Sequence, residues 1–364
     1  FSRRPWPWYW WCQSLLSSLQ TSPLSTESEL CVPHLNSSCK KPAHPPTTTM
    51  LIYILLSSVS LITVALNLLV IISISHFRKL HTPTNLLLLS LAATDLLVGL
   101  LLMPVEIIYI EACWFLGDII CTVYYIIDYI ITSASVANMV LISLDRYVAI
   151  CDPLRYTTKV TKGVVQLYVC LCWVCSIFYR LLLLHDHLEQ PGRSNSCFGE
   201  CVVIINYISG IIDLVFTFII PISVIVILYL RVFVVALAQA RSLRSQVAAQ
   251  RPGMVTVRKT EMKAARTLGI VVKSELKAAR TLGVVLLVFL LCSCPYYCFS
   301  VAAEHNVLAA ETVVVQVWLI YLNSCLNPVI YAFFYPWFRK SVRHIVTLRI
   351  LQPDSCEANM LQRD

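Results

Sequence analysis

The sequence predicts an all-α membrane protein, a seven-transmembrane helix bundle with a short interfacial helix after the seventh span. Of the 364 residues, 58% are hydrophobic and only 13% are charged, whereas a soluble domain usually carries about a quarter charged residues. The apolar residues are concentrated in seven blocks, and a helix needs about 20 apolar residues to cross the hydrocarbon core of a bilayer. The loops between the blocks are alternately basic and acidic, as expected for a chain that crosses a membrane repeatedly.

The seven predicted spans divide the chain into three parts. We expect an N-terminal extracellular segment 1–49, a receptor domain 50–335 and a cytoplasmic tail 336–364. The spans cover about 50–75, 86–110, 119–150, 163–184, 202–235, 276–303 and 312–334. After the seventh span, apolar residues such as Trp337 alternate with basic residues such as Arg339, which predicts an amphipathic helix in the membrane interface.

The distribution of charge predicts the orientation. Lys and Arg gather in the loops after the first, third and fifth spans, while the opposite loops carry acidic residues, among them Glu106 and Glu200. Short loops rich in Lys and Arg stay in the cytoplasm. We therefore expect a plasma-membrane protein with its N-terminus outside and its C-terminus inside. The net charge of +8 then indicates contact with membrane lipid and no nucleic acid partner.

Two segments are irregular. Residues 259–286 contain a tandem duplication of 14 residues, part of which lies in the predicted cytoplasmic loop 236–274. The first copy either prolongs the sixth helix or is an insertion that a loop tolerates, and we favour the insertion. Residues 1–26 lack the aliphatic core of a signal peptide. We interpret them as an unstructured extension whose native origin stays open.

Asp95, Asp128 and Asp213 lie well inside predicted spans, away from the span ends. A charged side chain at the membrane centre costs about 2.5–3.5 kcal/mol on insertion scales, so it is usually functional. We find no nucleotide loop, catalytic triad or metal-ligand cluster, so we expect neither an enzyme nor a bound cofactor. A transporter would commonly show repeated halves, and the chain shows none. An intramembrane protease would need paired catalytic carboxylates, and the motifs below explain these aspartates better.

Each predicted span contains one recognisable motif, and the motifs occur in a fixed order. They are Asn67, Asp95, Asp145-Arg146-Tyr147, Trp173, Pro221, Phe289 with Ser293-Cys294-Pro295, and Asn327-Pro328-Val329-Ile330-Tyr331. The set resembles the rhodopsin-like G-protein-coupled receptors. Residues 323–338 resemble the signature of the trace amine-associated receptors, and the resemblance covers about residues 29–360, most closely the fish members. It implies an olfactory amine receptor that couples to a stimulatory heterotrimeric G protein.

The resemblance also implies an activation switch near the cytoplasmic ends of the spans. Arg146 would pair with Asp145 and Glu275 in the inactive state and move toward Tyr229 and Tyr331 on activation. The implied switch residues are Asp145, Arg146, Tyr147, Tyr229, Glu275, Phe289, Ser293, Pro295, Asn327, Pro328 and Tyr331.

Around Asp95, the resemblance implies a pocket for an allosteric sodium ion. The alternative is a polar packing cluster that holds no ion. The residues expected to supply oxygen atoms are Asp95, Ser135, Asn323, Ser324 and Asn327, with Asn67 beside them.

Six cysteines fall in segments that we assign to the outside, where disulfides form. The resemblance implies a bond between Cys121 and Cys201. It gives Cys197 either Cys31 or Cys39 as its partner, and Cys113 takes the cysteine that remains. Asn36-Ser37-Ser38 is a glycosylation sequon on the same side.

The expected ligand site surrounds Asp128, which follows Cys121 by seven residues, about 10 Å along a helix. The resemblance implies that Asp128 is the counter-ion of an amine and that Tyr321 orients it. Aromatic faces attract ammonium groups. The expected ligand-binding residues are Asp128, Asp213, Thr132, Thr217, Tyr296, Tyr297, Trp318 and Tyr321.

Asp213 lies in the outer half of the fifth span, eight residues before Pro221. A second carboxylate on the opposite wall of the pocket would favour a dication, as in the diamine-responsive members of the family. A monoamine or a histamine-like ligand, with Asp213 and Thr217 holding the ring, is the alternative. A further alternative is that Arg180, near the end of the fourth span, pairs with Asp213 and neutralises it.

Three residues depart from the family pattern: Ser293 where an aromatic residue is usual, Leu66 where Gly commonly precedes Asn67, and Arg180 in an apolar stretch. Together with the duplication, they leave open a divergent copy that signals poorly.

Overall fold

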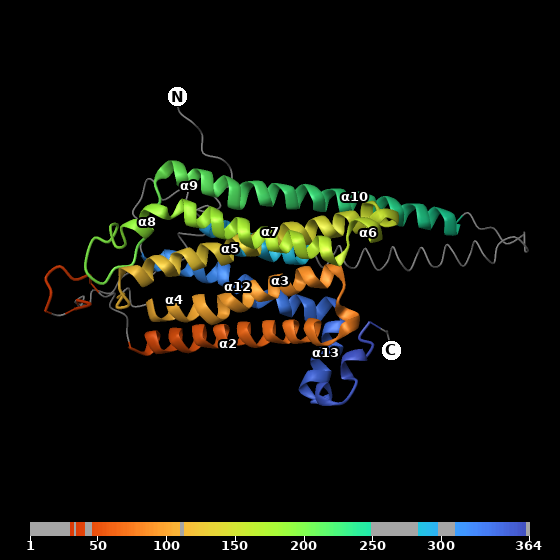
Figure 1. Ribbon diagram of the computed structural model, residues 1–364, viewed down its shortest axis with the longest axis horizontal. Coiled ribbons are helices and arrows are strands. Elements are labelled where there is room, and N and C mark those ends of the chain that lie inside the picture. Colours follow the sequence, from red (N-terminus) through yellow and green to blue (C-terminus); the bar gives the residue numbers. More distant parts are fainter. Residues whose placement is uncertain are drawn as a thin grey trace, which may run out of the picture.

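The computed structural model describes residues 30–32, 34–40, 46–109, 113–248, 283–297 and 310–361. Its long helices lie side by side along the long axis of the molecule (Figure 1). Six are long and apolar enough to cross a membrane, and a shorter apolar helix, Gly283–Tyr297, accompanies them. Within the described ranges, extended chain is limited to isolated bridges. The predicted all-α membrane bundle is confirmed.

The helices follow the predicted spans closely. Those of the spans are α2 (Pro46–His76), α3 and α4 (Pro83–Leu97 and Met103–Tyr109), α5 (Asp118–Cys151), α7 (Lys162–Leu183), α9 and α10 (Tyr207–Leu214 and Ile220–Ala248), Gly283–Tyr297, and α12 (Ala310–Phe334). The short helices are α6 (Pro153–Lys159), α8 (His185–Glu189) and α13 (Pro336–Val346). Most of the 259–286 duplication lies outside the described residues.

Polar caps decide where several helices begin. Thr82, Thr161 and Asn206 each accept a hydrogen bond from the backbone N–H three residues later, which satisfies one of the free donors at a helix start. The cap at Asn206 explains why the fifth span begins at Tyr207 and not at 202 as predicted.

Two spans contain a π-helical turn, which the sequence analysis did not predict. One, η2 (Val98–Leu102), joins α3 to α4, and the other, η3 (Val215–Ile219), joins α9 to α10. A π-turn inserts one extra residue, so it rotates everything beyond it by about 100° relative to a regular helix. The turn η2 therefore decides which side chains of α4 face the bundle.

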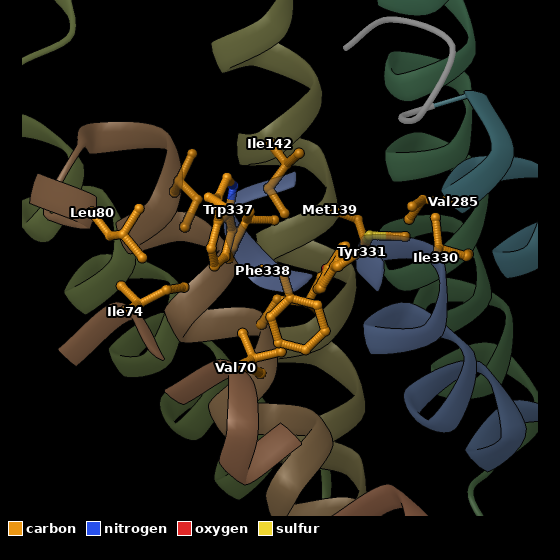
Figure 2. Packing of buried hydrophobic residues seen from close by; sticks show 14 of the residues in the cluster. Val70, Ile74, Leu80, Met139, Ile142, Val285, Ile330, Tyr331, Trp337 and Phe338 are labelled. Carbon is orange, nitrogen blue, oxygen red and sulfur yellow. The ribbon is translucent and has the colours of Figure 1, made fainter. Parts of the chain in front are cut away.

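The largest hydrophobic core fills one half of the bundle and contains residues from nearly every span. Figure 2 shows Val70 of α2 near Phe338 of α13 and Tyr331 of α12, with Ile74 nearer Leu80 in the same cluster. Tyr331 and Phe338 are both almost fully buried. By contrast, large apolar side chains are exposed along α2, α7 and α10. Such surfaces suit lipid, because a bilayer offers an apolar solvent to the outside of a bundle.

The two ends of the bundle differ. Three disulfides hold the loops at one end, which we call the disulfide end. At the other, the tail end, α13 begins with Pro336 directly after Tyr335, as the predicted short helix after the seventh span. There the Arg339 guanidinium donates to the carbonyl oxygens of Ala332 and Phe333 at 2.7 and 3.0 Å, which satisfies free acceptors at the end of α12.

Candidate functional site

Asp128 and Tyr321 meet in the half of the bundle nearer the disulfide end. Asp128 lies on α5, and the Tyr321 hydroxyl on α12 donates to its Oδ1 atom at 3.0 Å. The ion pairs of the described residues use other acids, such as Asp145 and Asp213. Asp128 therefore carries a negative charge that no described Lys, Arg or His pairs with at contact distance.

Aromatic side chains line the same region. Trp318 is buried and packs edge-on against Tyr321, with the ring centroids 6.1 Å apart. On the adjacent helix, Tyr296 lies within electrostatic range of Asp128, and Tyr297 stacks on Phe218 at 4.0 Å. Aromatic faces of this kind attract ammonium groups.

Thr132 lies one helical turn beyond Asp128 on α5 and is partly buried, so it shares the face of Asp128. Thr217 lies in η3 and donates to the Asp213 carbonyl at 2.7 Å.

Asp213 has an internal partner, contrary to its expected role as a free second carboxylate. The Arg180 guanidinium donates to Asp213 Oδ1 at 2.6 Å. Tyr179 donates to the same oxygen at 3.1 Å, and Arg180 Nε donates to the Ser133 hydroxyl at 2.8 Å. Arg180 also lies 4.9 Å from the centroid of the Tyr129 ring. The structure adopts the alternative in which Arg180 neutralises Asp213, because a buried guanidinium needs a nearby anion.

Glu106 has a different position from the expected outer-loop one. It lies on α4 within the second span and accepts a hydrogen bond from Tyr124 of α5 at 2.7 Å. The hydroxyls of Tyr124 and Tyr321 are 3.3 Å apart. A continuous chain of polar contacts therefore runs from Glu106 through both tyrosines to Asp128. The sequence analysis missed Glu106 and Tyr124 as site residues. Glu106 lies four residues before the end of the predicted span 86–110, and this position could have indicated that it belongs to the span.

Three disulfides join the chain segments at the disulfide end, next to this region. The structure pairs Cys121 with Cys201, Cys39 with Cys197 and Cys31 with Cys113. Of the two partners left open for Cys197, it selects Cys39. Cys201 is buried, and its carbonyl oxygen accepts from Tyr109 at 3.4 Å and from Tyr125 at 3.3 Å. Asn36 is exposed at the same end.

A cavity of about 430 Å³ opens at this end. Trp114, Asp118 and Glu200 help to line it. Trp114 also packs against Tyr124, with ring centroids 6.2 Å apart. The cavity thus lies next to the polar chain that leads to Asp128, and its own carboxylates give it a negative lining.

A second polar cluster lies around Asp95 in the middle of the bundle. Asn327 donates to Asp95 Oδ2 at 2.9 Å, and Asn67 donates to the Ser324 carbonyl at 3.1 Å. Within the described residues, several buried oxygens of this cluster have no hydrogen-bond donor; they are Asn67 Oδ1, Asp95 Oδ1, Asn323 Oδ1 and Asn327 Oδ1. Ser135 of α5 is partly buried. Unpaired buried oxygens are costly, so the donor set fits a hard cation, which prefers oxygen ligands.

At the tail end, Arg146 pairs with Asp145, with Nη2 and Oδ2 2.5 Å apart. Thr84 donates to Asp145 at 2.9 Å, and Tyr156 of α6 donates to its other oxygen at 2.8 Å. Burial raises the pKa of Tyr156, which keeps the phenol protonated as a donor. The arrangement holds Arg146 against its own helix. Glu275, the other expected partner, lies outside the described residues.

Of the remaining switch residues, Tyr331 lies close to this pair. Tyr331 lines a small cavity together with Arg146 and Tyr335. The Tyr229 phenol lies against Gly283, where a side chain on Gly283 would collide with it. Phe289 and Ser293 are buried on the same short helix. A serine there leaves less side-chain volume in the bundle than an aromatic residue would. Tyr147 packs on a separate small cluster with Ile150 and Val232.

The chain matches known proteins over most of its length. The model of the 7 transmembrane receptor (rhodopsin family) matches residues 66–331. The chain is 37% identical to trace amine-associated receptor 13c of Danio rerio, over 95% of this chain and 98% of that receptor. It is 35% identical to trace amine-associated receptor 4 of Mus musculus over 92% and 96%, and 37% identical to trace amine-associated receptor 1 of Mus musculus over 85% and 92%.

Proposed function

Because this chain belongs to the trace amine-associated receptors of the rhodopsin family, we propose that it binds a small organic amine through Asp128. Receptors of this family are not enzymes, and the ligand acts by being bound. The observation that carries the proposal is the Asp128 carboxylate, held by Tyr321 at 3.0 Å and lacking an internal cation at contact distance. An ammonium group supplies the missing positive charge and three N–H donors.

The charge requirement follows from the environment of Asp128. A charged partner stabilises a carboxylate that is buried among helices much more than it stabilises an exposed carboxylate. Losing one member of such a pair typically costs 2–5 kcal/mol. An amine should therefore bind in its protonated form, and a neutral molecule of the same shape should bind weakly. Trp318 and Tyr296 would add cation–π attraction of about 0.5–2 kcal/mol each.

A diamine preference through Asp213 loses its support. That carboxylate already has Arg180 at 2.6 Å, and a second ammonium placed there would have to displace the guanidinium. The same pairing weakens the histamine-like alternative, which needed Asp213 to hold the ring. The amine proposal consequently rests on Asp128. Whether the ligand carries one or two ammonium groups depends on residues other than Asp213.

For signalling, we propose that the disulfide end faces the outside of the cell and the tail end meets a heterotrimeric G protein of the stimulatory type. The Asp145–Arg146 pair supports this proposal. In this structure Arg146 is bound to Asp145 of its own helix, as expected of the inactive state, and breaking the pair would free Arg146 at the tail end. We also propose an olfactory role and glycosylation at Asn36, which the family resemblance implies. Around Asp95, a sodium ion would be held by Asp95, Ser135, Asn323, Ser324 and Asn327, and it would supply positive charge to oxygens that lack donors.

The experiment is a cyclic AMP assay in cells that express the receptor at a measured surface level. Pentylamine should raise cyclic AMP in a dose-dependent manner, whereas pentanol, the neutral molecule of matched length, should not. Asp128→Ala should abolish the response while surface labelling persists. A response to pentanol equal to that of pentylamine would overturn the proposal, as would unchanged potency in Asp128→Ala.

A further inference from the structure

The second span brings an additional carboxylate, Glu106, to the wall of the amine pocket. The π-turn η2 precedes α4, and its extra residue turns Glu106 toward α5 and α12 rather than toward lipid. π-turns inside helices are frequent at functional sites. Glu106 is partly buried and hydrogen-bonded to Tyr124 at 2.7 Å, so its acidic group is directed into the bundle.

The contacts between Glu106 and Asp128 are short enough for one ligand to reach both. Successive polar contacts of 2.7, 3.3 and 3.0 Å connect Glu106, Tyr124, Tyr321 and Asp128. The two carboxylate oxygens at the ends of this chain are therefore no more than about 9 Å apart. A short alkyl chain with an ammonium at each end spans such a gap.

The four side chains from Glu106 to Asp128 have fewer donor protons than acceptor sites. The Tyr321 hydroxyl donates its proton to Asp128, and the Tyr124 hydroxyl donates its proton to Glu106. A phenol has one proton to donate, so no proton remains for the 3.3 Å contact between the two phenol oxygens. The wall consequently presents lone pairs on four side chains, and an ammonium group is the donor that such a surface accepts.

The charge balance points the same way. Glu106, Asp128 and Asp213 face this half of the bundle, and Arg180 is the cation that pairs with one of them. Among the described residues, Glu106 has no ion pair. Buried carboxylates need a compensating charge, and two of the three depend on one from outside the chain.

Trp318 provides an independent sign that a polar molecule belongs here. Its side chain is only 9% exposed, and its indole Nε1–H has no acceptor in the described part of the chain. Trp318 belongs to the buried cluster that also includes Tyr321, Tyr124 and Ile107, the neighbour of Glu106. A buried donor left unsatisfied costs about 1–3 kcal/mol, so this wall has hydrogen-bonding capacity that the protein itself does not use.

We propose that Glu106 is a second anionic anchor of the amine pocket, and that the receptor prefers a linear diamine lying between Asp128 on α5 and Glu106 on α4. This inference rests on the proposed function and specifies its ligand class. It assigns diamine selectivity to the second and seventh spans, and not to Asp213 on the fifth.

The test compares pentylamine with the linear diamine of the same chain length on surface-matched receptors. The diamine should be at least tenfold more potent on the wild type. Glu106→Gln should lower diamine potency at least tenfold and change pentylamine potency less than threefold. Glu189→Gln is the matched control, because it removes the same charge from α8 near the disulfide end, where the Glu189 side chain is 65% exposed and does not line the cavity. It should leave the diamine preference intact.

Tyr124→Phe separates direct contact from positioning. If Glu106 only orients Asp128 through the tyrosines, both Tyr124→Phe and Glu106→Gln would weaken the two amines equally, and the second-anchor proposal would be overturned. Equal wild-type potency of the two amines would overturn it as well, leaving the amine proposal standing. A wild type at the surface that responds to no amine would overturn both proposals together.

Discussion

The Arg180–Asp213 pair offers the sharpest test of how the pocket is balanced. The guanidinium and carboxylate lie 2.6 Å apart, and their side chains are 2% and 14% exposed. Removing one partner of such a buried pair leaves an uncompensated charge and typically costs about 3–5 kcal/mol, whereas replacing both by apolar residues is often neutral. Arg180→Leu should therefore destabilise the receptor strongly, and Asp213→Leu should do the same.

The assay is a double-mutant cycle on detergent-solubilised receptor, with surface labelling of intact cells measured in parallel. Each single variant should lower the melting temperature and the surface level. The double variant Arg180→Leu with Asp213→Leu should recover most of both, giving a coupling energy of about 2 kcal/mol or more. Ser133→Ala removes one further Arg180 contact and should have a smaller effect in the same direction.

Two results would refute this reasoning. Additive losses in the double variant would mean that the two side chains do not depend on each other. An Arg180→Leu receptor of wild-type stability with a newly acquired diamine response through Asp213 would mean that the carboxylate is free to bind ligand, as first expected from the sequence.

Three further predictions concern other parts of the receptor. Tyr321→Phe removes the donor to Asp128 and should weaken amine potency by about tenfold or more, because hydrogen bonds to charged groups contribute about 1.5–3 kcal/mol; dose–response curves with unchanged potency would contradict it. Ser293→Trp should change basal cyclic AMP or maximal response more than amine affinity, since the added ring fills the buried position beside Phe289; an affinity shift alone would argue against a switch role. Cys39→Ser and Cys197→Ser should reduce surface level equally, and the double variant should be no worse than either, whereas a larger loss in the double variant would mean that these cysteines act separately.

The sequence predicted the spans because hydrophobic length is a local property, and it predicted the contact of Asp128 with Tyr321 through family resemblance. Other features depend on three-dimensional detail. The turn η2 inserts one residue without any marker in the apolar stretch that contains it, and it turns Glu106 inward although that residue reads as part of a loop.

Pairings between distant residues were only partly predictable. Arg180 and Asp213 lie on different helices, 33 positions apart, and the sequence does not show how those helices face each other, so their ion pair appeared in the sequence as one alternative among several. The partner of Cys197 was likewise open between Cys31 and Cys39, because these two cysteines are only eight positions apart and the sequence does not fix which thiol lies nearer to Cys197. The cap at Asn206 was visible in the sequence, but the apolar residues before it concealed the true start of the fifth span.

The central claim is that the charge of Asp128 binds the ammonium of the ligand. The most direct measurement is the potency of pentylamine on the wild type and on Asp128→Asn at matched surface level, since asparagine keeps the size of the side chain and an acceptor for Tyr321. We predict a loss of at least about thirtyfold, which corresponds to about 2 kcal/mol. Equal potency on the two receptors would contradict the account.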